Sequence, residues 1–91
     1  MYERIDVWKR KGSGLAVRFQ CLRRVADGMF AVQNADYLRP ETFKTDVRSS
    51  DFRFVELFFE DDPTNRCDWF SSLAEAISSH ERDFMDMPGS L

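Results

Sequence analysis

The chain has 91 residues, a formal net charge of −3 at pH 7, 43% hydrophobic residues and 32% charged residues, with nine Phe and two Trp. This composition is typical of one small globular domain and excludes a chain that is disordered throughout. No apolar run approaches the roughly 20 residues that cross a bilayer, and the first residues lack the apolar segment of a signal peptide. The sequence therefore predicts a soluble cytoplasmic protein without a membrane partner.

Two segments near the start of the chain alternate between apolar and polar residues, as a half-buried strand requires. The first covers residues 5–9 and the second residues 15–21, and Gly12-Ser13-Gly14 lies between them. This pattern predicts a β-hairpin with a three-residue loop at residues 11–13 and Gly14 at a bulge. In that register Val7 lies opposite Val17, and Ile5 lies opposite Phe19.

A second turn is indicated at Asp27-Gly28, between apolar segments on either side. Asp followed by Gly tolerates the positive φ angles of a two-residue type I′ turn, so a third antiparallel strand is expected after it. Residues 34–50 carry weaker signals and are predicted to form a loop. Long irregular connections in small domains are often functional, which directs attention to this loop.

Residues 51–60 contain apolar side chains at both odd and even positions. Their aromatic and β-branched content favours a central strand, with a short helix as the alternative. Residues 61–85 then space apolar residues at three and four positions, which predicts one amphipathic helix. Its N-cap is either Asp62, followed by Pro63, or Asn65, with Asp68 three residues later.

These elements together predict an α+β fold: a four-stranded antiparallel sheet, in the order β-β-β-loop-β, with one C-terminal amphipathic helix packed on one face. Residues 1–86 are expected to form a single domain and residues 87–91 a flexible tail. The expected core consists of Ile5, Val7, Val17, Phe19, Val32, Val55 or Phe54, Leu57 or Phe58, Trp69 or Phe70, Leu73, Ile77 and Phe84.

The inventory of reactive residues does not indicate an enzyme. The chain has a single histidine, His80, and its two cysteines, Cys21 and Cys67, are far apart in sequence. No metal-ligand spacing, glycine-rich phosphate loop or nucleophile elbow is present. We therefore expect no catalytic residues, no metal and no cofactor, and two reduced structural thiols.

A single helix covers only one face of a sheet, so the other face is expected to be open and to bind another protein or a second copy of the chain. This interpretation describes a small non-enzymatic accessory, adaptor or inhibitor-like module. The residues expected to form the interface are Trp8 and Arg18 on the sheet face, and Tyr37, Arg39, Phe43 and Arg48 in the loop. The alternative is a module that binds single-stranded nucleic acid through Trp8, Lys9, Arg10, Lys11 and Arg18, because aromatic rings stack on bases while cations contact phosphates.

Overall fold

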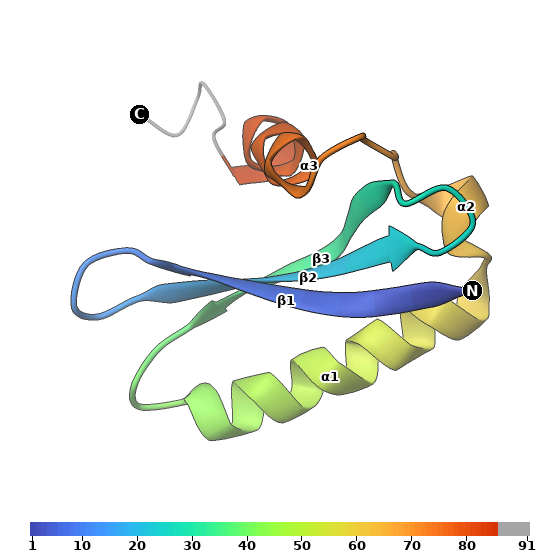
Figure 1. Cartoon of the computed structure of the whole chain (residues 1–91). Helices are drawn as coiled ribbons and strands as arrows, with labels where there is room; N and C mark the ends of the chain where they lie inside the picture. The colour runs from blue at the N-terminus through green and yellow to red at the C-terminus, as the bar shows by residue number, and fades with distance from the viewer. Residues whose placement is uncertain (86–91) are drawn as a thin grey trace.

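The computed structural model describes residues 1–85 and shows an antiparallel sheet with a helix on each face (Figure 1). The strands are β1 (Tyr2–Arg10), β2 (Ala16–Arg24) and β3 (Phe30–Leu38); the helices are α1 (Phe43–Glu60), α2 (Pro63–Arg66) and α3 (Leu73–His80), which continues into the π-helical turn η1 (Glu81–Met85). The α+β class and the antiparallel sheet are confirmed, whereas the fourth strand and the single C-terminal helix are wrong. In this part of the chain no helix combines the length and apolar character needed to cross a membrane. The tail predicted at 87–91 lies outside the described residues.

The three strands form a meander in the order β1-β2-β3. β1 pairs with β2 along its whole length, and Val7 lies opposite Phe19 while Ile5 lies opposite Cys21. The predicted register, with Val7 opposite Val17, is therefore wrong by two residues. A shift of two keeps every side chain on its own face of the sheet, so the apolar alternation does not distinguish the two registers.

The first hairpin loop places its special backbone conformation at a different glycine from the one expected. Gly12 has a φ of 74°, whereas Gly14 does not take a positive φ. The backbone N–H of Lys11 donates to the carbonyl of Leu15 at 2.8 Å and closes the loop. The predicted bulge at Gly14 is replaced by a left-handed turn at Gly12, where the missing side chain removes the steric cost.

The second hairpin loop is longer than predicted. The N–H of Arg24 donates to the carbonyl of Met29 at 2.8 Å, and Gly28 takes the left-handed conformation with a φ of 71°. Asp27 has no positive φ, so the turn is not the two-residue type I′ turn, which needs positive φ at both central residues. A side-chain oxygen of Asp27 instead accepts from the N–H of Met29 at 3.2 Å.

The segment predicted as a loop and then a strand is largely one 18-residue helix, α1. β3 continues to Leu38, and only a short link separates it from the start of α1 at Phe43. The N–H of Asp46 donates to the carbonyl of Thr42 at 3.1 Å in the first turn. The apolar residues at odd and even positions of 51–60 therefore form two stripes along the helix. Phe54 and Leu57 face inward, and a second set faces outward.

The region predicted as one long helix is divided into two. Asp62 caps α2 by accepting from the N–H of Thr64 at 2.9 Å, and Pro63 occupies the first turn. This confirms the first of the two predicted N-caps. However, α2 ends at Arg66, and the following extended segment bridges Phe70 to Phe30. α3 then has a new N-cap at Ser72, whose hydroxyl accepts from Glu75 N–H at 3.1 Å.

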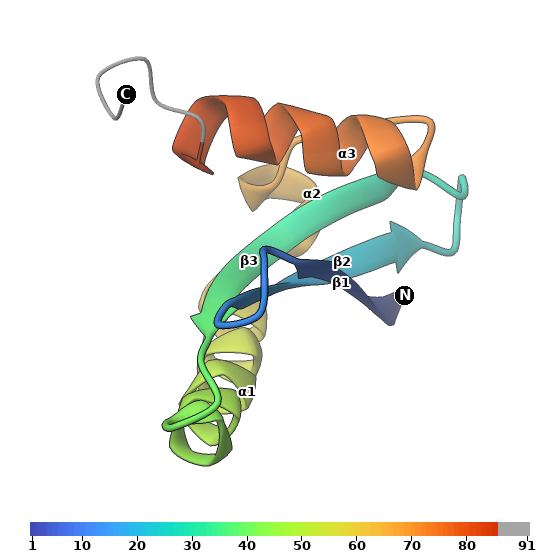
Figure 2. The same cartoon turned by 90° about the vertical axis from the view of Figure 1, so that its left-hand side faces the viewer.

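The segment that contains α2 carries the chain around the end of the sheet, so that α3 lies on the face opposite α1 (Figures 1 and 2). The expectation of an open sheet face is therefore wrong, because each face is covered by a helix. Much of the predicted core is confirmed beneath α3, where Ile5, Val7, Val17, Phe19, Val32, Leu73 and Ile77 pack with Cys21 and Ala35. Of the remaining core candidates, Phe54 of α1 is buried against the sheet, and Leu57, Trp69 and Phe70 are half-buried. Val55 and Phe58 are exposed. The side chain of Phe84 lies outside the described part of the chain.

Candidate functional site

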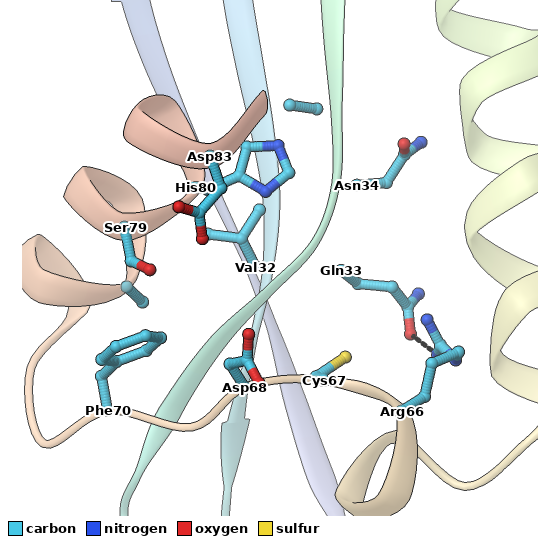
Figure 3. Close-up of a pocket in the computed structure, with 12 residues that line it drawn as sticks. Val32, Gln33, Asn34, Arg66, Cys67, Asp68, Phe70, Ser79, His80 and Asp83 are labelled. Atoms are coloured by element: carbon cyan, nitrogen blue, oxygen red, sulfur yellow. Dashed lines mark hydrogen bonds between the residues drawn. The ribbon is translucent and has the colours of Figure 1, made fainter. Parts of the chain in front are cut away.

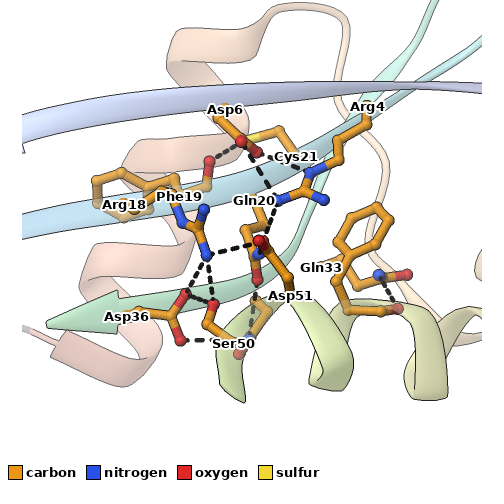
Figure 4. Close-up of polar contacts among 12 residues, drawn as sticks. Arg4, Asp6, Arg18, Phe19, Gln20, Cys21, Gln33, Asp36, Ser50 and Asp51 are labelled. Atoms are coloured by element: carbon orange, nitrogen blue, oxygen red, sulfur yellow. Dashed lines mark hydrogen bonds and ion pairs between the residues drawn. The ribbon is translucent and has the colours of Figure 1, made fainter. Parts of the chain in front are cut away.

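Polar side chains occupy the middle of the sheet face beneath α1. Arg18 on the central strand is only 4% exposed, and its Nη2 donates to Ser50 Oγ of α1 at 2.8 Å. The same nitrogen lies 3.0 Å from Asp51 Oδ1 and 3.9 Å from Asp36 Oδ2 (Figure 4). The guanidinium is thus surrounded by oxygen atoms from α1 and from β3. The predicted role of Arg18 at an open interface is incompatible with this burial.

Arg4 of β1 extends this polar layer. Its Nη2 donates to Asp51 Oδ1 at 2.8 Å, and its Nε donates to Asp6 Oδ1 at 3.0 Å (Figure 4). The hydrogen bond from Arg4 is the main cause that holds the pKa of Asp51 below its ordinary value. The fully buried amide of Gln20 belongs to the same layer. Among the described residues the buried Nε of Arg18 has no hydrogen-bond partner, but its Nη2 contacts Ser50 and Asp51 of α1. We therefore interpret the layer as the set of contacts that fixes the position of α1 on the sheet.

The outer side of α1 is apolar instead. Phe52, Val55 and Phe59 are 66%, 47% and 84% exposed, and their spacing of three and four residues places them on one side of the helix. A shallow groove of about 450 Å³ runs along this side, with Lys44 and Arg48 at its N-terminal part and Phe52 and Val55 further along. We name these three apolar residues the outer stripe. Sequence reasoning missed them because it assigned residues 51–60 to a central strand.

A second groove, of about 340 Å³, lies between the first hairpin and the start of α1. Trp8, Arg39 and Phe43 line it, and Val47 lines both this groove and the one along the outer stripe. Three of the six predicted interface residues are therefore brought together, and Arg48 lies in the neighbouring groove. Tyr37 is exposed but lines a separate hollow.

The residues of the nucleic-acid alternative do not share one face. The Arg18 guanidinium lies 5.6 Å from the Trp8 ring, but it is buried. Lys9 points to the other side of the sheet, where its Nζ lies 2.6 Å from Glu81. Arg10 and Lys11 are exposed near the hairpin loop, and Arg10 also lines the Trp8 groove.

A third hollow, of about 450 Å³, lies between β3 and α3 (Figure 3). Arg66 lines one end, where its Nη2 donates to Gln33 Oε1 at 2.6 Å; Cys67 and His80 also line the hollow. Burial raises the pKa of Cys67 and lowers the pKa of His80. Both groups are therefore favoured in their neutral forms, which is the opposite of the thiolate and imidazolium that an activated cysteine requires.

The cysteines are free, and Cys21 is buried in the core, where burial raises its pKa to about 12. Within residues 1–85 no group of three or more His, Cys, Asp or Glu side chains is arranged to hold a metal ion. Comparison of the chain with protein-family models, with curated proteins and with solved structures found no significant match.

Proposed function

We propose that this chain is a small, non-enzymatic protein-interaction module that binds a partner protein through the outer stripe of α1. The observation that carries the proposal is the exposure of aromatic residues on the outer side of this helix. Ser50 is buried against the sheet, whereas Phe52 and Phe59 project into solvent. A helix that only covers a sheet turns its aromatic residues inward, so outward aromatic rings indicate a surface that another molecule covers.

The groove around Trp8 and Phe43 supports the same proposal, because it extends the apolar surface beyond the outer stripe. Burial of a large apolar side chain contributes about 1.5–3 kcal/mol, so Phe52 and Phe59 together would supply roughly 3–6 kcal/mol. Association costs at least about 4 kcal/mol in lost freedom of motion. The two phenylalanines alone would give weak binding, and contacts in the Trp8 groove would make it specific.

The charges beside the outer stripe indicate the kind of partner. Lys44 and Arg48 flank its N-terminal part, and the carboxylate of Asp51 in the same groove is already paired with Arg4 and Arg18. A partner with apolar side chains next to carboxylates fits this arrangement, since rim charges steer association and select the orientation. We place this binding in the cytoplasm, where the two free cysteines would remain reduced.

The proposal can be tested by photo-crosslinking in cells. A photoreactive benzoylphenylalanine at position 59 should yield a covalent adduct with a discrete protein, and the same residue at position 52 should capture the same protein. The matched control is position 78, an exposed serine of α3. Absence of an adduct at position 59, or the same adducts at position 78, would refute the proposal.

The Trp8 groove also favours a second candidate function, the binding of single-stranded nucleic acid. Trp8 and Phe43 expose aromatic rings there, and Arg10 and Arg39 line the same groove. Bases stack on such rings while arginines contact phosphates, although the net charge of −3 opposes this binding. Fluorescence of Trp8 in a Trp69→Phe protein should be quenched by an oligonucleotide in a salt-dependent way; an unchanged signal would dismiss this candidate.

A further inference from the structure

β1 is an edge strand whose outer side is unprotected in the described part of the chain. Its nine residues pair with β2 without a bulge, and they include neither proline nor glycine. Neither α1 nor α3 runs along its outer edge (Figures 1 and 2). The opposite edge differs, because β3 pairs irregularly opposite Gln20 and Cys21 and is bridged to Phe70. Natural proteins usually block such an edge, so an open β1 indicates a surface that pairs with another strand.

The hydrogen-bonding pattern shows which residues of β1 are available for pairing. The N–H of Lys11 donates to the Leu15 carbonyl, and the N–H of Val25 donates to the Met1 carbonyl. Met1 and Lys11, the odd-numbered residues that flank β1, thus bond toward β2 and its flanking residues, and the alternation of an antiparallel ladder extends this to the odd residues between them. The backbone groups of the even-numbered residues therefore point outward. Among residues 1–85 they make no backbone hydrogen bond outside the strand ladder.

Antiparallel pairing of two β1 strands about a two-fold axis at Asp6, the middle residue, engages the entire strand. On the α3 side of the sheet, Glu3 of each copy then lies opposite Lys9 of the other, and Ile5 lies opposite Val7. Opposite charges and apolar pairs at directly facing positions stabilise a sheet. The sequence of β1 is therefore complementary to itself in this register.

The α1 side of the sheet is complementary in the same register. Arg4 lies opposite Trp8, and Tyr2 lies opposite Arg10, so each copy offers two arginine–aromatic pairs. The only like-charged pair is Asp6 against Asp6. Each of these carboxylates already lies 3.0 Å from Nε of Arg4 in its own chain.

Neighbouring registers are less complementary over the whole strand. Pairing centred on Ile5 places Arg4 opposite Asp6 and Tyr2 opposite Trp8, but it engages only residues 2–8 and leaves Glu3 opposite Val7. Pairing centred on Val7 places Arg4 opposite Arg10. Charged residues on an edge usually oppose pairing, but in the register centred on Asp6 only Asp6 faces its like, and Arg4 of its own chain already pairs with it. Within the chain, Lys9 also contacts Glu81, and Glu3 contacts Arg23. These surface ion pairs are weak enough to be shared with a second copy.

We propose that β1 pairs antiparallel with β1 of a second copy, centred on Asp6, so that one continuous sheet runs through a symmetric dimer. Two-fold symmetry makes every contact occur twice, which is the usual route to a homodimer. The outer stripe of α1 is not part of this interface. The inference therefore stands independently of the proposed function.

A charge-swap experiment tests both the edge and the register by sedimentation velocity over a range of concentrations. Glu3→Lys places lysine against Lys9 of the second copy, and Lys9→Glu places glutamate against Glu3. Each variant alone should dimerise about tenfold more weakly than the wild type or worse, because two like-charged pairs form per dimer. An equimolar mixture of the two variants should regain the dimer, since both pairs are again of opposite charge.

The matched control is Glu41→Lys, which makes the same charge change at an exposed residue between β3 and α1. It should dimerise like the wild type. Thermal unfolding of each variant verifies that it is folded. A wild-type protein that stays monomeric at high concentration, single variants that dimerise normally, a folded mixture that does not recover the dimer, or equal weakening by Glu41→Lys would each overturn the proposal.

Discussion

Arg18 on β2 and Asp51 on α1 form the ion pair that joins the central strand to the long helix, with 3.0 Å between Nη2 and Oδ1. Arg18 is buried, whereas the side chain of Asp51 remains half exposed. A charge removed from water in this way needs partners, and α1 supplies them. The contact explains why the helix lies over polar side chains of the sheet.

Loss of the Arg18 guanidinium should destabilise the fold. Arg18→Met keeps the volume of the side chain but removes the hydrogen bond to Ser50 and the positive charge beside Asp36 and Asp51, so we expect the free energy of unfolding to fall by about 2–4 kcal/mol. Urea denaturation measures this as a lower midpoint with an unchanged slope. The control is Arg53→Met, whose exposed ion pair with Glu60 spans 3.9 Å; it should cost less than about 0.5 kcal/mol. Equal losses would contradict the role of Arg18.

Acid should weaken the contacts that Asp51 makes with Arg4 and Arg18. The hydrogen bond from Arg4 is the main cause that holds the pKa of folded Asp51 below its ordinary value of 3.8. A carboxyl whose pKa is lower in the folded state stabilises the protein above the unfolded pKa and loses that contribution as the pH falls through the folded pKa. The stability advantage of the wild type over Asp51→Asn should therefore be constant down to about pH 5 and should shrink below about pH 4.

This comparison requires urea titrations of both proteins from pH 7 to pH 2. Asp27 and Asp62 also have lowered pKa values, but both proteins contain them, so their contributions cancel in the difference. A difference that grows as the pH falls would show that the pKa of Asp51 is raised by folding, against our interpretation.

The first hairpin allows a matched pair of glycine substitutions. Gly12→Ala should destabilise the protein by about 1 kcal/mol, because alanine is strained at a φ of 74°. Gly14→Ala should be neutral or slightly stabilising, since Gly14 has no positive φ and open space surrounds its position. Thermal melts of the two variants measure the difference, and a greater loss at Gly14 would restore the bulge expected from the sequence.

The two sides of α1 should respond differently to truncation. Phe54 is buried against the sheet, so Phe54→Ala should cost about 3–4 kcal/mol. Phe59 is exposed, and Phe59→Ala should change the free energy of unfolding by less than about 0.5 kcal/mol. Chemical denaturation measures both, and similar losses at the two positions would mean that both rings are buried within one copy.

The meander and the core beneath α3 could be predicted from the sequence because alternation at Val17, Phe19 and Cys21 is a local signal of a half-buried strand. Register was not predictable in this way, since a shift of two residues preserves both faces. Arg18 and Gln20 resemble surface residues in sequence. Only the distant residues Ser50 and Asp51 make them part of an interior.

The strand predicted at residues 51–60 was wrong for a related reason. Aromatic and β-branched residues at both parities fit a central strand that is buried on both sides. They fit a helix equally well if one stripe remains exposed, as Phe52, Val55 and Phe59 do. The types of Trp8, Arg39, Phe43 and Arg48 suggested an interface, but the outer stripe was missed because a strand places Phe52 and Phe54 on the same face, whereas the helix separates them.

The most direct test of the exposed aromatic side of α1 is ¹⁹F NMR of the protein labelled with fluorophenylalanine, with each signal assigned by single Phe→Leu substitutions. Exchange of H₂O for D₂O shifts the signals of solvent-exposed rings. We expect large isotope shifts at Phe52 and Phe59 and none at Phe19 and Phe54. Equal protection of Phe52 and Phe54, as two residues on one face of a strand would show, would contradict the helix and the binding surface inferred from it.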